Sequence, residues 1–237
     1  KCWLHKQGSF ITSFFPEGAE ANVDYGVFYL PPVDEAYGKP FLVAGDIMAM
    51  FNDRPEVRAL MEYFTLGESL KGWLAAGGAF SPHKDVNLDW YSIELERSIA
   101  ELVAGATSVR FDASDLMPGE VGAGSFWKGM TDYVSGAADL DTALSEIDAS
   151  WPTGIEGQAG PSDEGAETAG GYLERAYAGE FDGTVVIVDG PFTDEDEVKF
   201  MAGMQPFMDA TGIDVQYIGS KEFEASISVR VDAGDAA

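Results

Sequence analysis

Trp127 is the side chain of this sequence best placed to bind a small molecule. It lies in the stretch LMPGEVGAGSFWKGMTDYVSG, residues 116–136, where a Gly-rich segment leads into a predicted helix that opens with Phe126 and Trp127. An indole one turn into a helix can stack on the apolar face of a sugar ring, or it can pack under the preceding loop. Helical spacing predicts the core stripe beside it: Phe126, Met130, Tyr133 and Val134.

Asp46 is the strongest carboxylate candidate for the same kind of site. Sugar recognition needs aromatic faces together with carboxylate or amide groups that accept hydrogen bonds from hydroxyls in a dry cleft. Asp46 follows Gly45 inside a predicted apolar strand, 41–51. An acid there is costly unless it is paired or faces a cleft, and a structural role is the alternative.

Catalysis and metal binding are not predicted. His5 and His83 have no cysteine partner at metal-binding spacing, and neither a Gly-x-Ser-x-Gly elbow nor a Walker lysine loop occurs. Glu94 and Glu96 point to different faces of one helix and indicate solvated surface. The acidic run 194–197 fits helix-dipole complementarity at least as well as a cation site. We therefore predict no catalytic residues, no metal and no cofactor.

The elements that would position these residues indicate an α/β fold, with sheets covered by helices. Strands are predicted at 25–30, 41–51, 184–189 and 213–218. A helix is predicted after Asp53 as its cap, with Pro55 in its first turn, and residues 110–114 are read as a connector. Further amphipathic helices are expected around 57–76 and 95–103.

A β-α-β unit is predicted near the end of the sequence. The strand 184–189 leads to a helix whose first residues, 193–196, look like a capping box, and Gly212 ends that helix before the strand 213–218. A further helix starts at 220–227. The apolar face of the central helix is predicted to consist of Val198, Met201, Met204, Phe207 and Met208.

Charge and composition exclude several classes of protein. The net charge of -27 comes from 41 acidic and 14 basic residues, and it argues against binding to nucleic acid or anionic membranes. No apolar run approaches the length of a membrane span. A hydrophobic content of 46% is enough for one substantial core or two small lobes. Cys2 is the only cysteine, so no intrachain disulfide is predicted.

Several segments resemble the extracellular sugar-binding proteins of ABC importers, most closely the alpha-glucoside and maltose-type branch. Residues 116–136 resemble the last ligand-contacting segment of that family, in which an aromatic–Trp pair opens a late helix and the Trp stacks on the sugar. Residues 41–51 resemble the strand that crosses back into the first lobe, and 52–64 the helix after it. Residues 141–152 resemble the family's closing helix.

The resemblance implies further contacts with the ligand. Phe126 joins Trp127 in the binding segment, and the N-terminal segment resembles a region where relatives place another ring-contacting residue. The candidates in that N-terminal segment are Trp3, His5 and Gln7.

First-lobe contacts are implied at the ends of the two strands of the β-α-β unit. Phe192 and Thr193 follow the first strand, and Lys221 follows the second. The alternative for Thr193 is an N-cap role, and the alternative for Lys221 is a solvated lysine.

The order of the pieces is reversed relative to the family. Residues 1–152 resemble its C-terminal part, 172–237 resemble its N-terminal β-α-β part, and the long middle is absent. Residues 153–171 have the composition of a flexible linker and resemble the tether after a lipid-bearing Cys. An engineered permutation with a deletion, a fragment spanning two tandem copies, and a natural rearrangement would each produce this order.

The implied architecture is periplasmic-binding-protein-like, type II, with two lobes that close on a sugar by a hinge, here permuted and incomplete. Lobe one would be built from 41–108 and 172–237, and lobe two from 1–30 and 115–152. The linker, 153–171, would join the two parts of the sequence.

We expect a non-enzymatic receptor that captures an oligosaccharide, an alpha-glucoside by resemblance, and delivers it to an ABC permease. It would be a monomer, unless two chains exchange segments, in the periplasm or outside the cell. The parent would be tethered as a lipoprotein, with its export signal outside the given sequence. The alternatives are a rearranged scaffold that binds nothing and a glycan-active hydrolase, which would need two carboxylates at glycosidase separation.

Overall fold

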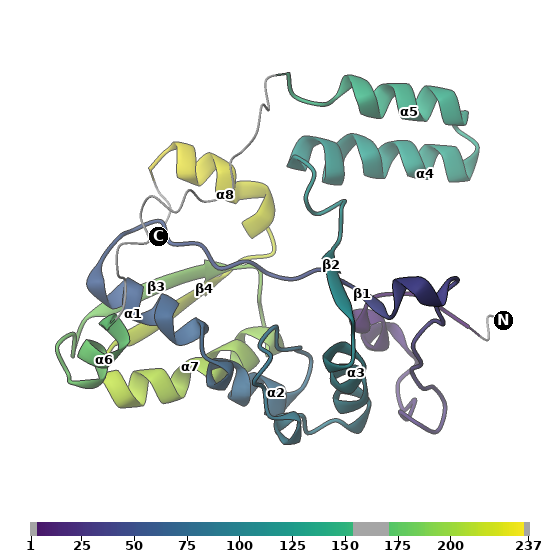
Figure 1. Cartoon of the computed structure of the whole chain (residues 1–237). Helices are drawn as coiled ribbons and strands as arrows, with labels where there is room; N and C mark the ends of the chain where they lie inside the picture. The colour runs from purple at the N-terminus through teal and green to yellow at the C-terminus, as the bar shows by residue number, and fades with distance from the viewer. Residues whose placement is uncertain (1–3, 154–170, 235–237) are drawn as a thin grey trace. The chain divides into compact units, whose positions relative to one another are not determined.

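The computed structural model describes residues 4–153 and 171–234 (Figure 1). Trp3 and nearly all of the predicted linker lie outside the described residues. The chain divides into two units, which we describe one at a time. Unit 1 takes its described residues from 1–30, 48–105 and 168–237, and unit 2 from 31–47 and 106–167.

Unit 1 is built around a two-stranded parallel sheet. Strand β3 (Val185–Gly190) is joined to strand β4 (Asp214–Gly219) by helix α7 (Glu195–Thr211). The strands pair in register from Val185 opposite Asp214 to Gly190 opposite Gly219. The predicted β-α-β unit is confirmed, with each strand displaced by one residue, and the left-handed Gly212 ends α7 as expected.

The other elements of unit 1 are helical. They are the short 3-10 helices η1 (Ser9–Phe14), η3 (Gly67–Leu70) and η4 (Leu88–Trp90), and the helices α1 (Pro55–Phe64), α2 (Lys71–Ala76), α3 (Glu94–Ala104), α6 (Tyr172–Tyr177) and α8 (Phe223–Asp232). Helices α1, α6 and α7 lie on one side of the sheet and α8 on the other (Figure 1). The strand predicted at 25–30 is wrong, since only an isolated bridge between Ala21 and Tyr25 forms there.

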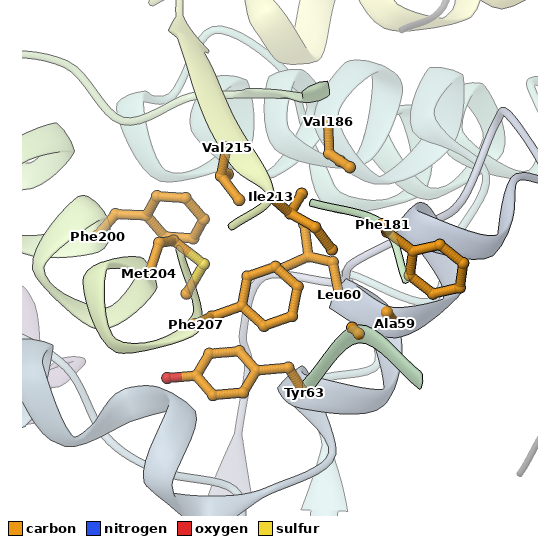
Figure 2. Packing of buried hydrophobic residues seen from close by; sticks show 11 residues of the cluster. Ala59, Leu60, Tyr63, Phe181, Val186, Phe200, Met204, Phe207, Ile213 and Val215 are labelled. Carbon is orange, nitrogen blue, oxygen red and sulfur yellow. The ribbon is translucent and has the colours of Figure 1, made fainter. Parts of the chain in front are cut away.

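The core of unit 1 lies between one face of the sheet and helices α1 and α7 (Figure 2). Its sheet side is formed by Val186 and Val215, which are register partners. Its α7 side is formed by Phe200, Met204 and Phe207, which recur at helical spacing. The predicted α7 face is therefore partly wrong: Val198 is exposed, and Phe200 is buried instead.

Two predicted helix caps are also wrong. Arg54, not Asp53, precedes α1, and the Asp53 carboxylate instead accepts two hydrogen bonds from Arg58, at 2.5 and 2.7 Å. That guanidinium holds the pKa of Asp53 below its ordinary value. At α7 the capping position is Asp194, which has a φ of 58° and makes no side-chain capping bond.

Helix α7 approaches η3 and α2 closely because two glycines lie at the contact. A Cβ built on Gly72 would stand 2.4 Å from the backbone oxygen of Ala202, and one on Gly203 would stand 2.8 Å from the backbone oxygen of Ser69. At the same place the buried Tyr63 hydroxyl donates a 2.9 Å hydrogen bond to the Gly203 carbonyl, which ties α1 to α7.

Glu96 is not the solvated surface residue that its sequence context indicates. Its side chain is half-buried in α3, and its Oε1 accepts a 2.9 Å hydrogen bond from the Gly78 N–H, while its buried Oε2 has no hydrogen-bond partner among the described residues. Burial raises the pKa of Glu96, although that bond and the nearby Lys199 ammonium act in the opposite direction.

Unit 2 contains a second two-stranded parallel sheet and a helical hairpin. Strand β1 (Pro40–Val43) pairs with β2 (Ser108–Phe111), and the remaining elements are η2 (Glu35–Tyr37), η5 (Glu120–Phe126), α4 (Trp127–Ser135) and α5 (Leu140–Ala149). The strand predicted at 41–51 is shorter than expected and ends at Val43. Strand β2 occupies much of the segment that the sequence indicated to be a connector.

The helical hairpin corrects the expected core stripe. Helix α4 ends at the left-handed Gly136, and α5 lies beside it (Figure 1). Gly129 of α4 faces Ile147 of α5, since a Cβ on Gly129 would stand 3.1 Å from that side chain. Tyr133 and Val134, predicted to be core, are exposed, the latter by 84%.

The Gly-rich segment before Trp127 is helical rather than a loop. Residues 120–126 form η5, a wide π-type turn that continues directly into α4. Trp127 therefore lies in the middle of a continuous helical segment, not one turn from its beginning.

We predict that Gly72→Ala lowers the free energy of unfolding by about 1–3 kcal/mol, because its methyl group would collide with the α7 backbone. Urea titration followed by circular dichroism measures this. Gly26→Ala is the control, since nothing lies within 4 Å of a Cβ built there. Equal effects of the two substitutions would contradict the close α2–α7 contact.

We also predict that Glu96→Gln raises the melting temperature more at pH 7 than at pH 4. The raised pKa means that the folded state holds the proton more tightly. The proton on Glu96 therefore stabilises the folded state fully below the unfolded-state pKa, about 4.3. This stabilisation is lost as pH rises through the folded-state pKa. Glu94→Gln on the same helix is exposed and serves as control. If the melting temperatures of the parent and Glu96→Gln differed by the same amount at pH 4 and at pH 7, the raised pKa assigned to Glu96 would be refuted.

Candidate functional site

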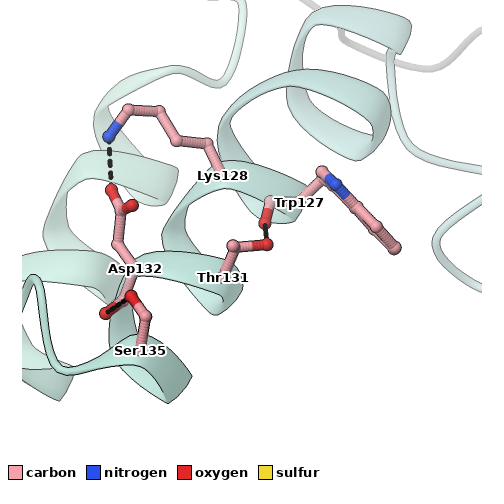
Figure 3. A network of polar contacts seen from close by, with 5 residues as sticks. All are labelled: Trp127, Lys128, Thr131, Asp132 and Ser135. Atoms are coloured by element: carbon pink, nitrogen blue, oxygen red, sulfur yellow. Dashed lines mark hydrogen bonds and ion pairs between the residues drawn. The ribbon is translucent and has the colours of Figure 1, made fainter.

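Trp127 presents its indole to solvent. The side chain is 73% exposed, and in Figure 3 it points away from the other labelled residues of α4. It borders a shallow depression whose remaining lining residues are Met130, Thr131, Val134 and Ser135. Because α-helical neighbours at i+4 and i+8 share a face, one flat aromatic surface and two hydroxyls lie on one ridge of the helix.

The polar groups beside Trp127 are held by bonds within the helix (Figure 3). The Thr131 hydroxyl donates to the Trp127 carbonyl at 2.8 Å, and the Ser135 hydroxyl donates to the Asp132 carbonyl at 3.1 Å. A hydroxyl that donates in this way keeps lone pairs for accepting another hydrogen bond. The Lys128 ammonium binds the Asp132 carboxylate at 2.5 Å, and this bond raises the pKa of Lys128.

Gly45 and Asp46 lie just beyond the carboxyl end of β1, both exposed. Parallel strands end at the same edge, and at this edge Asp112 and Ser114 follow β2. The Asp112 carboxylate accepts hydrogen bonds from the Ser114 hydroxyl at 2.6 Å and the Ser114 N–H at 2.9 Å. Sequence reasoning missed this pair, which an Asp-x-Ser signal directly after a recognised strand would have revealed.

Three predicted residues of unit 1 meet at the carboxyl edge of β3 and β4. Phe192 and Thr193 follow β3, and Lys221 follows β4. The loops cross closely there, because a Cβ on Gly219 would stand 2.1 Å from the backbone oxygen of Phe192. The Lys221 ammonium lies 3.6 Å from the Asp194 carboxylate, and both side chains are exposed.

The Phe192 ring is partly buried among other aromatic rings. It meets Trp73 edge-on at a centroid distance of 4.9 Å and stacks on Tyr217 at 6.2 Å. The backbone N–H of Phe192 donates a 2.9 Å hydrogen bond to the Tyr217 hydroxyl. Neighbouring rings therefore cover much of the Phe192 ring. The Thr193 hydroxyl, by contrast, lies near solvent and donates a 3.2 Å hydrogen bond to the Asp194 carboxylate.

The most buried charge at this edge was not found from the sequence. Asp189, the penultimate residue of β3, has a side chain only 7% exposed and forms an ion pair with Arg230 of α8. Its second oxygen, Oδ1, is buried and has no hydrogen-bond partner among the described residues. The sequence signal that could have indicated Asp189 is an acidic residue near the end of an otherwise apolar strand.

The remaining predicted residues lie near the N-terminus. His5 and Gln7 are exposed in unit 1, and the Gln7 amide oxygen accepts a 2.9 Å hydrogen bond from the Gly8 N–H. Trp3 lies outside the described residues. The structure thus groups Phe192 with Thr193 and Lys221 in unit 1, and it places Phe126, Trp127, Gly45 and Asp46 in unit 2. Their roles in ligand binding stay predictions.

The described part of the chain contains neither a cluster of metal-binding side chains nor a helix fit to span a membrane. Within residues 4–153 and 171–234, no three or more His, Cys, Asp or Glu side chains gather where they could hold a metal ion. Over the same residues, no helix combines the length and the apolar character needed to cross a membrane.

Comparison with known proteins shows what this chain is similar to. A segment of the chain matches two curated solute-binding proteins, one of them named for binding alpha-glucosides, which confirms the resemblance seen in the sequence. The mixed α/β composition agrees with that class.

Two curated relatives show the match. Over 151 residues, 64% of this chain, the sequence is 48% identical to the osmoprotective compounds-binding protein GgtB of Synechocystis sp. strain PCC 6803. Over 145 residues, 60% of this chain, it is 42% identical to the alpha-glucosides-binding periplasmic protein AglE of Rhizobium meliloti. These segments cover 35% and 32% of the relatives, so the chain spans about a third of their length. No protein-family profile matches the chain, and no solved structure does.

We predict that Arg230→Met destabilises unit 1 by about 3 kcal/mol, because it leaves the Asp189 carboxylate buried without its cation. Chemical denaturation measures the loss. Lys221→Met is the matched control, since its exposed pair with Asp194 contributes at most about 1 kcal/mol. The double variant Asp189→Asn with Arg230→Met should recover much of the loss. Equal losses for the two single variants would show that the buried pair has no special weight.

Proposed function

We propose that this chain is part of an extracytoplasmic solute-binding protein that captures an oligosaccharide of the alpha-glucoside class for import through an ABC permease. The observation that carries the proposal is the exposed indole of Trp127 on a helix that also presents two hydroxyls. The relatives, one named for binding alpha-glucosides and one for osmoprotective compounds, support this ligand class.

The chemistry of the α4 ridge suits a sugar. The apolar side of a pyranose ring can lie on the Trp127 indole, while the ring hydroxyls donate hydrogen bonds to Thr131 and Ser135, whose own protons are already used. The exposed Asp46 carboxylate of the same unit would add a further acceptor. A shallow depression alone supplies few of the contacts that a tight site needs.

The architecture that we propose is the two-lobed, type II periplasmic-binding-protein fold, permuted and incomplete. The longer match covers 151 residues, close to the length of the predicted C-terminal part, 1–152. The lobe assignment stays a prediction, and residues 1–30, assigned to lobe two, cluster with unit 1.

Location and partners follow from the same proposal. One relative is named as a periplasmic protein, and we propose a periplasmic or extracellular location, with the parent protein tethered as a lipoprotein. The partners would be the oligosaccharide and the membrane subunits of the permease. The net charge of -27 keeps such a protein well solvated and favours a monomer.

We propose that the chain is not an enzyme. Both relatives are named for binding. A hydrolase would need an acid and a base or nucleophile, two carboxylates on either side of a bound glycosidic bond. Release of reducing sugar from maltose or trehalose during incubation with the protein would overturn this reading and favour the hydrolase.

We predict that the protein binds at least one of maltose, trehalose and sucrose, and that Trp127→Ala weakens binding at least about 30-fold. Truncating a central aromatic anchor typically costs about 2 kcal/mol or more. Isothermal titration calorimetry of the parent and the variant measures the change. Trp151→Ala in the same unit is the control, because Trp151 does not line the depression.

The outcome separates the proposed receptor from a scaffold that binds nothing. The receptor is supported if a sugar gives a heat of binding with the parent and with Trp151→Ala but not with Trp127→Ala. Absence of heat with every glycan, together with an unchanged melting temperature, favours the scaffold. Equal weakening by the two substitutions would remove Trp127 from the site.

A further inference from the structure

The segment that precedes Trp127 has a rare backbone conformation. Residues 120–126 form η5, a π-type helix, in which backbone hydrogen bonds join residues five apart rather than four. Turns of this kind are uncommon, and they are found frequently at functional sites. Because η5 continues directly into α4, its geometry sets how Trp127 is turned about the helix axis relative to the residues before it.

The π-type turn aligns three residues that hold this helical segment in place. Val121 is fully buried. The Ser125 hydroxyl contacts Ser150, and Gly129 lies against Ile147. In an α-helix, residues four apart are displaced by about 40° around the axis, so Val121 and Gly129 would lie about 80° apart. A π turn contains one residue more, so each residue advances less and this displacement shrinks.

A chain of hydroxyls ties the end of η5 to α5. The Ser150 hydroxyl donates a 2.7 Å hydrogen bond to the Ile147 carbonyl, so it accepts the 2.5 Å bond from the Ser125 hydroxyl. The alternative acceptor for Ser125 is the Val121 carbonyl at 3.4 Å, which is too distant to compete. Both serines are partly buried. The bond is therefore directed from η5 to the end of α5.

The beginning of η5 is held by close packing. A Cβ built on Gly122 would stand 2.5 Å from the backbone oxygen of Ser114 and 3.2 Å from the Met117 side chain. This end of η5 has no room to turn against the segment before it. A change in the π-type turn would therefore be transmitted towards α4 and Trp127.

We propose that Ser125 and Ser150 are positioning residues for Trp127. Their hydrogen bond holds the π-type turn of η5 and thereby fixes the direction of the indole. Without the bond, η5 relaxes towards α-helical spacing, and the indole loses its preset orientation for the flat face of a sugar ring. The effect on sugar affinity rests on the proposed function, whereas the orientation of the indole can be measured without a ligand.

Fluorine NMR of the full chain labelled with 5-fluorotryptophan provides the test, and Trp127→Phe assigns the Trp127 resonance. In Ser125→Ala we expect this resonance to shift or broaden by more than its line width in the parent. The resonances of Trp73 and Trp90, which lie in unit 1, should stay in place. An unchanged Trp127 resonance in Ser125→Ala overturns the proposal.

Further variants separate the hydrogen bond from a general effect on the hairpin. Ser125→Thr keeps the hydroxyl and should restore the parent resonance. Ser145→Ala removes an exposed hydroxyl from α5 and should leave the Trp127 resonance unchanged. Equal changes in Ser125→Ala and Ser145→Ala contradict the proposal. If Ser125→Ala loses helical circular dichroism, Ser150→Ala removes the same bond from the other side and takes its place.

Calorimetry with maltose, trehalose and sucrose measures the consequence for binding. We expect Ser125→Ala to weaken sugar binding about three- to tenfold, since the side chain must then be ordered on binding. A changed Trp127 resonance without sugar binding by the parent supports the positioning role and removes the proposed ligand. Sugar binding that depends on Trp127 but is unaffected by Ser125→Ala supports the receptor and overturns the positioning role.

Discussion

Burial of one face of the β3–β4 sheet beneath α7 is the interaction on which unit 1 depends. Val186 and Val215 are register partners on that face, and Phe200, Met204 and Phe207 fill the space below them (Figure 2). A parallel strand pair has no hairpin to hold it together, so the crossover helix must supply the packing. Because α7 packs on this face, the loops after β3 and β4 lie at the same edge of the sheet. Phe192, Thr193 and Lys221 are therefore close together in space.

In unit 2 a single glycine sets the direction in which the candidate ligand-binding residue faces. Gly129 lies against Ile147, so that side of α4 is turned toward α5. Trp127 precedes Gly129 by two residues, and Thr131 follows it by two, each about 200° around the helix. Both therefore face away from α5. The indole is exposed because Gly129, on the opposite side of α4, occupies the contact with α5.

The sequence alone determined what depends on local pattern. Alternating and helical hydrophobic spacing located the β-α-β unit to within one residue at each strand, Gly212 marked the end of α7, and the segment around Trp127 indicated the family. Its errors lie where local preference was overruled: Asp53 binds Arg58 instead of capping α1, residues 25–30 form no strand, and the Gly-rich segment before Trp127 is helical.

Only the tertiary structure decided which charges are buried and which side of each helix is covered. Asp189 and Glu96 read as ordinary acids in sequence, and their burial follows from α8 and from the Gly78 loop, which are distant along the chain. Val198 and Phe200 are both compatible with a helical stripe, and contact with the sheet selected Phe200. Spacing along one element fixes the candidates for burial, whereas the choice among them depends on what another element places opposite.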